Sequence, residues 1–268
     1  HNCLDLTHAM IRSLEDTVDL SIHELVLIDD ASDSETANWL QKLEAPYRIL
    51  RNETNLGFSA SNNKAARHAT GDYLVFLNND LELAPNWLEP MLELERTLPK
   101  VGAVGNIQKN FQTGLVDHAG IFFDTTGMPT HAWKNRKKHP KGDWIKRSAI
   151  TAACLLIKRS LFEEMNGFDE SYRNGMEDVD LCVRLRNAGY QLIVAHKSVI
   201  RHHISCSPGR HDHNDRNSEL FRQRWSNSMR QTGIHEWPSE YFHRYARYWW
   251  RINPGLAWKA LKMLIFRR

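Results

Sequence analysis

The sequence has no uncharged apolar run of about 18 residues, the length that a helix needs to span a lipid bilayer. Its first residues show neither the charged region nor the apolar region of an export signal. The four cysteines, Cys3, Cys154, Cys182 and Cys206, are far apart and lack the spacing of a metal site or a disulfide framework. Together these absences favour a cytoplasmic protein in a reducing compartment.

The charge is also small and unevenly distributed. The net charge of +3 is too low to predict nucleic acid as the partner. Ten Lys and Arg residues but only two acids lie between Arg222 and Arg268, so the basic character belongs to the C-terminal end. With 268 residues and 41% hydrophobic content, we expect one catalytic domain over residues 1–225 and a basic, aromatic, helical tail over residues 226–268.

Apolar and turn residues alternate over the first 80 residues in the manner of an α/β fold. The pattern predicts a helix near residues 6–14, a strand at 25–28, a helix from 32 to about 43, a strand at 47–50, a helix at 59–68 and a strand at 73–77. Ser32 and Glu35 have the spacing of a capping box, which would start the second helix. Strands that alternate with helices predict a parallel sheet with right-handed crossovers.

Later segments have shorter elements. Short strands with glycine turns are expected at residues 101–123, and residues 128–147 form a polar, basic and aromatic loop that is long enough to be functional. We then expect a strand at 149–157, helices at 160–165 and 179–188, and a last strand at 191–194.

Acidic and amide side chains follow two of the predicted strands. Asp29 and Asp30 come after the first strand, and Asn78, Asn79 and Asp80 come after the third. Ligands bind at the carboxyl ends of parallel strands, and neighbouring carboxylates there repel unless a cation lies between them. Oxygen ligands of this kind suit Mg²⁺ or Mn²⁺. The alternative is that each cluster is an ordinary strand-end turn or helix cap.

A third acidic cluster, Glu177, Asp178 and Asp180, opens a predicted helix. One carboxylate would be enough for capping, so the cluster also predicts a general base held near an acceptor hydroxyl. His202 and His203 follow the last strand, where a neutral imidazole could complete a metal shell. Histidines with an ordinary core or surface position are the alternative.

Several short motifs occur together and in one order. They are Asn55-Leu56-Gly57-Phe58 through Asn62-Asn63, residues 71–80, residues 101–105, Asp117-His118-Ala119-Gly120, residues 167–170, residues 177–185, and His202-His203 before Ser207. As an ordered set over about residues 2–225, they resemble bacterial family 2 glycosyltransferases of surface polysaccharide biosynthesis. The resemblance implies the GT-A fold, an α/β architecture whose mostly parallel, Rossmann-like central sheet is flanked by helices.

The resemblance also implies a reaction. A hexose or deoxyhexose would move with inversion from a nucleotide-diphosphate sugar, with UDP or dTDP as the nucleotide, to a glycan or lipid-linked glycan acceptor. Residues expected at the donor are Asp29, Asp30, Asn55, Gly57, Phe58, Asn62, Asn78 and Asn79.

The metal and the base are implied in the same way. Asp80 ends the family's D-x-D-like motif and, with His202 rather than His203, would hold Mn²⁺ or Mg²⁺ on the donor diphosphate. Asn78 stands where that motif often has its first acid, so one ligand is neutral. Asp178 matches the general base, and Glu177 lies beside it as a second catalytic candidate.

Two other functions compete with glycosyl transfer. A sugar-phosphate nucleotidyltransferase would need a glycine-rich, basic phosphate loop, which the sequence lacks. A non-catalytic module that binds a nucleotide sugar or a glycan is supported by Asn78 and by the start of the chain. The family begins with an apolar strand, and this sequence begins at His1-Asn2, just after it. We expect the sequence to be a piece of a longer chain; the alternative is that another segment takes the place of that strand.

Residues 237–268 interleave aromatic and cationic side chains. This composition suits peripheral contact with anionic lipid at the inner face of a membrane. A helix packed on the catalytic domain with a solvated basic face fits equally well. Pro254 and Gly255 interrupt the segment, so we expect two short helices rather than one.

Overall fold

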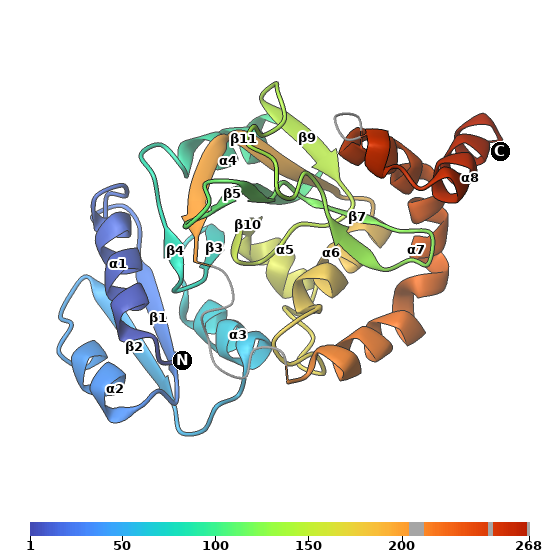
Figure 1. Ribbon diagram of the computed structural model, residues 1–268. Helices are drawn as coiled ribbons and strands as arrows, with labels where there is room; N and C mark the ends of the chain where they lie inside the picture. Colours follow the sequence, from blue (N-terminus) through green and yellow to red (C-terminus); the bar gives the residue numbers. More distant parts are fainter. Residues whose placement is uncertain (204–211, 246–248, 267–268) are drawn as a thin grey trace.

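The computed structural model describes residues 1–203, 212–245 and 249–266, so Cys206 and Ser207 lie outside the described residues. The N-terminal part forms one side of the molecule (Figure 1). It contains α1 (Leu4–Glu15), β1 (Leu25–Asp30), α2 (Ser34–Leu40) and β2 (Tyr47–Asn52). The apolar spacing that predicts the first helix is confirmed, since Met10, Ile11 and Leu14 of α1 are buried.

The strands β1 and β2 pair in parallel, from Leu25 opposite Tyr47 to Asp30 opposite Asn52. The predicted capping box between them is wrong. The residue that caps α2 is Asp33, whose side chain accepts a hydrogen bond from the Thr36 N–H at 2.9 Å.

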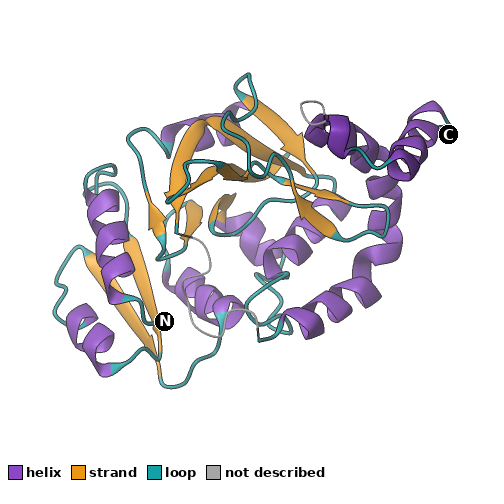
Figure 2. Ribbon diagram, viewed as in Figure 1, coloured by secondary structure: helices purple, strands orange, loops and turns teal. Residues whose placement is uncertain are grey.

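A sheet of seven strands occupies the centre of the molecule (Figure 2). Its strands are β3 (Tyr73–Leu77), β4 (Leu81–Glu82), β5 (Val101–Asn110), β6 (Val116–His118), β9 (Trp144–Arg147), β10 (Cys154–Lys158) and β11 (Gln191–His202). The order is β3-β10-β5-β11-β4, with β6 beside β5 and β9 beside β11. A two-stranded hairpin, β7 (Ile121–Phe123) with β8 (Pro129–His131), lies apart from it.

The expected parallel pairing is found between β1 and β2 and between β5 and β11, and the other neighbours in the central sheet are antiparallel. Parallel neighbours require a crossover connection, which α6 (Glu177–Asn187) provides before β11. β10 is reached through the hairpin and strand of residues 121–147 instead of through a helix, and it runs antiparallel to both of its neighbours.

Both faces of the central sheet are covered. Successive residues of a strand point to opposite faces, so Leu155 of β10 belongs to one buried cluster and Leu156 to the other. The first cluster includes apolar residues of α6, and the second includes those of α1 and α4 (Glu89–Thr97). The helices α3 (Phe58–His68) and α5 (Arg159–Glu164) complete the part of the chain before α7.

The C-terminal part is helical. It comprises α7 (Asn214–Tyr245), the short 3₁₀ helix η1 (Trp249–Arg251) and α8 (Pro254–Ile265). The expected break at Pro254 is present, because α8 begins there. The expected domain boundary at residues 225/226 falls inside α7, which is continuous across it. Among the described residues, no helix is both long and apolar enough to cross a membrane.

A gap separates β1 from β3. Residues of both strands line one cavity, and within the described residues β1 pairs only with β2 and β3 only with β10. The three N-terminal strands therefore do not form the single continuous sheet that their alternation with helices predicts. Among the described residues, no other strand pairs with β1 or β3 in the space between them, so no described segment takes the place of the expected strand.

Candidate functional site

The cavity between β1 and β3 has a volume of about 990 Å³ and extends to the starts of α3 and α6 and to the end of β11. It brings together almost all of the residues that the sequence predicts for the site. The lining includes Asp29, Asp30, Asn55, Gly57, Phe58, Asn62, Asn78, Asn79, Glu177, Asp178 and His202. Asp80 is not part of the lining but contacts His202, which is.

Asp29 and Asp30, at the end of β1, are buried and hydrogen-bonded to the protein. One oxygen of Asp29 accepts from the Ser32 N–H at 2.9 Å, and the other pairs with the Arg51 guanidinium. Asp30 accepts three hydrogen bonds. One comes from the side-chain amide of Asn52, and two come from the backbone N–H groups of Leu56 and Gly57. These carboxylates shape the rim of the cavity by holding its backbone.

The turn before α3 depends on Gly57. Its φ of +83° is a conformation that favours glycine, and its N–H donates to Asp30 at 2.9 Å. A Cβ at this position would lie 2.9 Å from Cγ of Arg173, whose guanidinium donates to the backbone and side-chain oxygens of Asn55. The N–H of Phe58, the first residue of α3, donates to Asn174 at 2.9 Å. The turn is therefore fixed from both sides.

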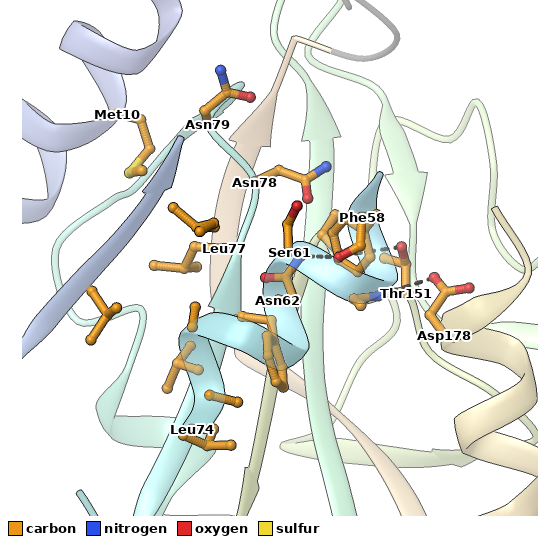
Figure 3. Close-up of a pocket in the computed structure, with 18 of the residues that line it drawn as sticks. Met10, Phe58, Ser61, Asn62, Leu74, Leu77, Asn78, Asn79, Thr151 and Asp178 are labelled. Carbon is orange, nitrogen blue, oxygen red and sulfur yellow. Dashed lines mark hydrogen bonds between the residues drawn. The ribbon is translucent and has the colours of Figure 1, made fainter. Parts of the chain in front are cut away.

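Two neighbouring asparagines of the predicted donor site, Asn78 and Asn79, differ in direction (Figure 3). Asn78 extends toward Ser61 and Asn62 of α3, whereas Asn79 turns away toward α1. The Asn79 amide donates to the Thr7 hydroxyl at 3.0 Å. Asn78 is therefore the member of the strand-end pair that faces α3 across the cavity.

Asp80 and His202 are nearly fully buried and lie next to each other. The Asp80 carboxylate oxygen Oδ1 is 3.1 Å from Nε2 of His202. Adjacent ligands of an octahedral ion lie about 3 Å apart when the metal–ligand bonds are about 2.1 Å, so this pair fits two neighbouring positions on Mg²⁺ or Mn²⁺. His203 donates its backbone N–H to Asp80, but its ring stacks on Phe111 with centroids 3.9 Å apart.

In the described part of the chain, no group of three or more His, Cys, Asp and Glu side chains is arranged to hold a metal ion. Mg²⁺ is commonly held by one or two protein carboxylates together with water and substrate phosphates. Asp80 and His202 therefore suit an ion that arrives with a phosphate-bearing ligand better than an ion held by the protein alone.

Asp178 and Glu177 stand at the start of α6. Asp178 is half-buried and accepts hydrogen bonds from the backbone N–H of Ala152 at 3.0 Å and of Val179 at 2.8 Å. Figure 3 shows it beside Thr151, on the far side of α3 from Asn79. Glu177 is buried, and its carboxylate accepts from the Gly175 N–H at 2.5 Å, so it holds the turn that precedes the helix.

Some residues of the lining were not predicted. His131, Lys134 and Asp117 line the cavity, and Lys134 pairs with Asp117 at 3.2 Å. Asp117 and its neighbour His118 belong to a motif that carries the family resemblance, so the sequence marked these positions but did not indicate what they do. No sequence signal pointed to Asn174, because its contact with Phe58 spans 116 positions of the chain.

Comparison with known proteins gives a family. The model of the family described as "Glycosyl transferase family 2" matches residues 1–165. The protein y4gI of Sinorhizobium fredii is 30% identical over 82% of the chain, and the O-antigen biosynthesis protein RfbC of Myxococcus xanthus is 31% identical over 76%. The chain spans only 25% and 16% of the lengths of these two relatives.

A third relative is closer in size. The N-acetylglucosaminyl-diphospho-decaprenol L-rhamnosyltransferase of Mycobacterium tuberculosis (strain CDC 1551 / Oshkosh) is 25% identical over 69% of this chain and 68% of its own length.

Solved structures confirm the GT-A fold. GalNAc-T7 with UDP, GalNAc and Mn²⁺ superposes with a TM-score of 0.60 at 18% identity, covering 72% of this chain and 40% of its own. The mannosyltransferase PcManGT from Pyrobaculum calidifontis, in complex with GDP-Man and Mn²⁺, gives a TM-score of 0.57 at 18% identity. It covers 99% of this chain and 72% of its own.

Proposed function

Because this chain belongs to glycosyl transferase family 2, we propose that it transfers a sugar from a nucleotide-diphosphate sugar to a glycan or lipid-linked glycan acceptor. The observation that supports this most is the shared cavity. A half-buried carboxylate at the start of α6, the buried His202 at the end of β11 and the polar ends of β1 and β3 line one space, and Asp80 contacts His202. The M. tuberculosis relative is named as a transferase with a lipid-linked acceptor, which is consistent with the acceptor class.

The charge of the cavity is consistent with a metal-assisted donor. The cavity is lined by more Asp and Glu residues than Lys and Arg residues. Asp29, Asp30 and Asp178 are among the acids, and Lys134 is a cation on the side where we propose that the acceptor binds. A diphosphate would be repelled by such a lining unless a cation accompanied it. Asp80 and His202 would hold Mn²⁺ or Mg²⁺ there, and the ion would supply Lewis-acid stabilisation of the departing diphosphate.

Asp178 is the proposed general base for a displacement with inversion. Its two hydrogen bonds come from backbone N–H groups, which fix its position at the cavity wall. From there it would take the proton of the acceptor hydroxyl as that oxygen attacks the anomeric carbon. Glu177 is proposed to position Asp178, because its carboxylate holds the turn before α6.

Nucleotide screening tests the proposed donor site. UDP, dTDP and GDP are each added with Mn²⁺, with Mg²⁺ or with EDTA, and the melting temperature is measured. We expect one of the nucleotides to stabilise the protein only when the metal is present, by about 2.7 kcal/mol at 100 times its Kd. The matching nucleotide sugars are then assayed for transfer and for hydrolysis in water. Stabilisation by none of the nucleotides with either metal would contradict the proposal.

Peripheral membrane contact through residues 237–268 is proposed as well. α8 packs on α7, with Ala260 fully buried, but it also carries exposed apolar side chains. Trp258 is 58% exposed and Ile265 is 65% exposed, and Lys262 lies over the Trp258 ring at 5.2 Å. Aromatic and cationic side chains on one exposed helix suit an anionic lipid interface.

Vesicle sedimentation tests this contact. Deletion from Pro254 onward, or the double substitution Trp258→Gln and Ile265→Gln, should abolish binding to phosphatidylglycerol-containing vesicles. Ile22→Gln is the matched control, because Ile22 is 75% exposed on the N-terminal side of the molecule. Equal sedimentation of the wild type and the double variant would rule out α8 as a membrane contact.

A further inference from the structure

Two histidine rings lie beside the cavity and have no part in the reaction as proposed so far. His118 ends β6 and His131 ends β8, and their Nδ1 atoms are 3.1 Å apart with the rings nearly perpendicular at 80°. His118 is only 1% exposed, whereas His131 is half-buried and lines the cavity together with Asp178. The charge of Asp178 acts on the His131 ring, so the pair connects the protein interior to the part of the cavity that holds the proposed base.

The hydrogen bonds of His118 determine which of its nitrogens carries the proton. The backbone N–H of Thr151 donates to Nε2 of His118 at 3.5 Å, so this nitrogen is an acceptor. Burial, assisted by the nearby His131 and Arg147, lowers the pKa of His118 well below its usual value, so the ring is neutral. A neutral imidazole with an accepting Nε2 carries its hydrogen on Nδ1. His118 therefore donates through Nδ1 to His131.

His131 must then have the opposite tautomer. Its Nδ1 accepts from His118, and burial lowers its pKa despite the nearby carboxylate of Asp117. The neutral ring carries its hydrogen on Nε2. Within residues 1–203, 212–245 and 249–266, no hydrogen-bond partner of His131 Nε2 is found, and the ring lines the cavity. The chain Thr151–His118–His131 thus ends in one oriented N–H donor.

We propose that the Nε2–H group of His131 binds an oxygen of the acceptor sugar next to the attacking hydroxyl, and so holds that hydroxyl against Asp178. This inference rests on the proposed function. A neutral donor suits this place because a charged imidazolium would compete with the acceptor hydroxyl for the Asp178 carboxylate. Asp117 lines the same wall and offers an accepting carboxylate, so the wall presents the donor and the acceptor that a sugar with adjacent hydroxyls requires.

Acceptor kinetics test the role of His131. His131→Phe keeps a ring but removes both nitrogens, and we expect the KM for the acceptor to rise about tenfold. The KM for the nucleotide sugar and its hydrolysis in the absence of acceptor should stay unchanged. His131→Gln places an amide N–H near the position of Nε2 and should recover part of the loss. His243→Phe is the control. The His243 ring packs on Trp133, two positions after His131, with ring centroids 4.5 Å apart, but His243 does not line the cavity.

Nitrogen-15 NMR of the histidine rings measures the tautomers without any substrate. We expect the hydrogen on Nδ1 of His118 and on Nε2 of His131. An active enzyme with His131 protonated on Nδ1, or with a raised KM for the nucleotide sugar alone in His131→Phe, overturns this inference and leaves the proposed function standing. A wild-type protein that neither hydrolyses nor transfers any nucleotide sugar overturns the proposed function, and the acceptor role with it.

Discussion

The carboxylates at the end of β1 and at the start of α6 are alike in the sequence and different in the structure. Asp30 is 7% exposed and accepts three hydrogen bonds from the fold. Asp178 is half-buried at the wall of the cavity and accepts two, both from backbone N–H groups. A carboxylate can accept about four hydrogen bonds, so Asp178 keeps more capacity for a ligand than Asp30 does.

This difference teaches that an acid at the end of a secondary-structure element has two separable uses. Asp30 mainly stabilises the turn before α3 through its hydrogen bonds, and a contact with a nucleotide would come in addition to these. Asp178 is fixed by the backbone and still borders the space where an acceptor would bind. The same substitution, Asp to Asn, should therefore damage catalysis at one site and stability at the other.

The largest effect is expected for Asp178→Asn. The amide keeps the size of the side chain but cannot take a proton, so the transfer rate should fall by about 10²- to 10⁴-fold. Nucleotide affinity should be almost unchanged. Both oxygens of Asp178 accept backbone N–H groups, but because Asp178 is only half-buried, the melting temperature should fall less than in Asp30→Asn. Transfer kinetics with isothermal titration of the nucleotide provide the measurement. A variant with full activity would exclude Asp178 as the base, and lost nucleotide binding would assign it to the donor.

The metal pair should show the next effect. His202→Gln removes a ring nitrogen 3.1 Å from Asp80, and the Mn²⁺ concentration needed for half-maximal nucleotide-dependent stabilisation should rise about 10- to 100-fold. His203→Gln is the matched control, since the His203 ring stacks on Phe111. Addition of EDTA should abolish transfer in the wild type, and Mn²⁺ should restore it. A larger shift in His203→Gln than in His202→Gln would reverse the assignment.

Asp30→Asn should lower stability. Its amide nitrogen would face a backbone N–H, because both oxygens of Asp30 accept hydrogen bonds from the turn of residues 55–57. A buried donor without its partner costs about 1–3 kcal/mol, so the free energy of unfolding should fall by that amount in urea titrations. An Asp30→Asn variant as stable as Asp178→Asn would remove the distinction between the two carboxylates.

Much of this fold could be predicted, because its signals are local. The apolar spacing of α1 and the short apolar run of β3 depend on near neighbours, and both elements occur where they were expected. The pairing of β10 between β3 and β5 depends on contacts far apart in the chain. Periodicity carries no information on that pairing, and the expectation of a mostly parallel sheet rests on the alternation of strands with helices and on the family resemblance.

The residues of the site also differ in how much of their role the sequence predicts. Residues in motifs, such as Asp178 and Gly57, could be proposed from the sequence, and both line the cavity. The direction of each side chain could not, because it depends on the neighbour that binds it. Asn79 turns toward α1 since its amide donates to Thr7, while Asn78, one position earlier, faces α3. The relation between His118 and His131 likewise arises only when β6 and the hairpin pack together.

A third carboxylate gives the smallest effect and tests the comparison away from the cavity. Glu236 of α7 accepts hydrogen bonds from the Ser148 hydroxyl and from the Phe123 N–H at 3.2 Å, the latter at the strand β7. Burial nevertheless raises the pKa of Glu236 above its ordinary value of 4.5. Its contribution to stability is therefore fully present below about pH 4.5, and it is lost as the pH rises through the raised pKa of the folded state.

Glu236→Gln should remove this dependence. The Ser148 hydroxyl can rotate to accept from the amide, so glutamine fits the same place without a charge. The difference in unfolding free energy between wild type and variant should change between about pH 4.5 and the raised pKa of the folded state, in favour of the variant at higher pH. We expect a change below about 1 kcal/mol, the order of a single hydrogen bond. Parallel pH profiles would mean that hydrogen bonds satisfy Glu236 as fully as they satisfy Asp30, and that burial alone does not distinguish the carboxylates of this protein.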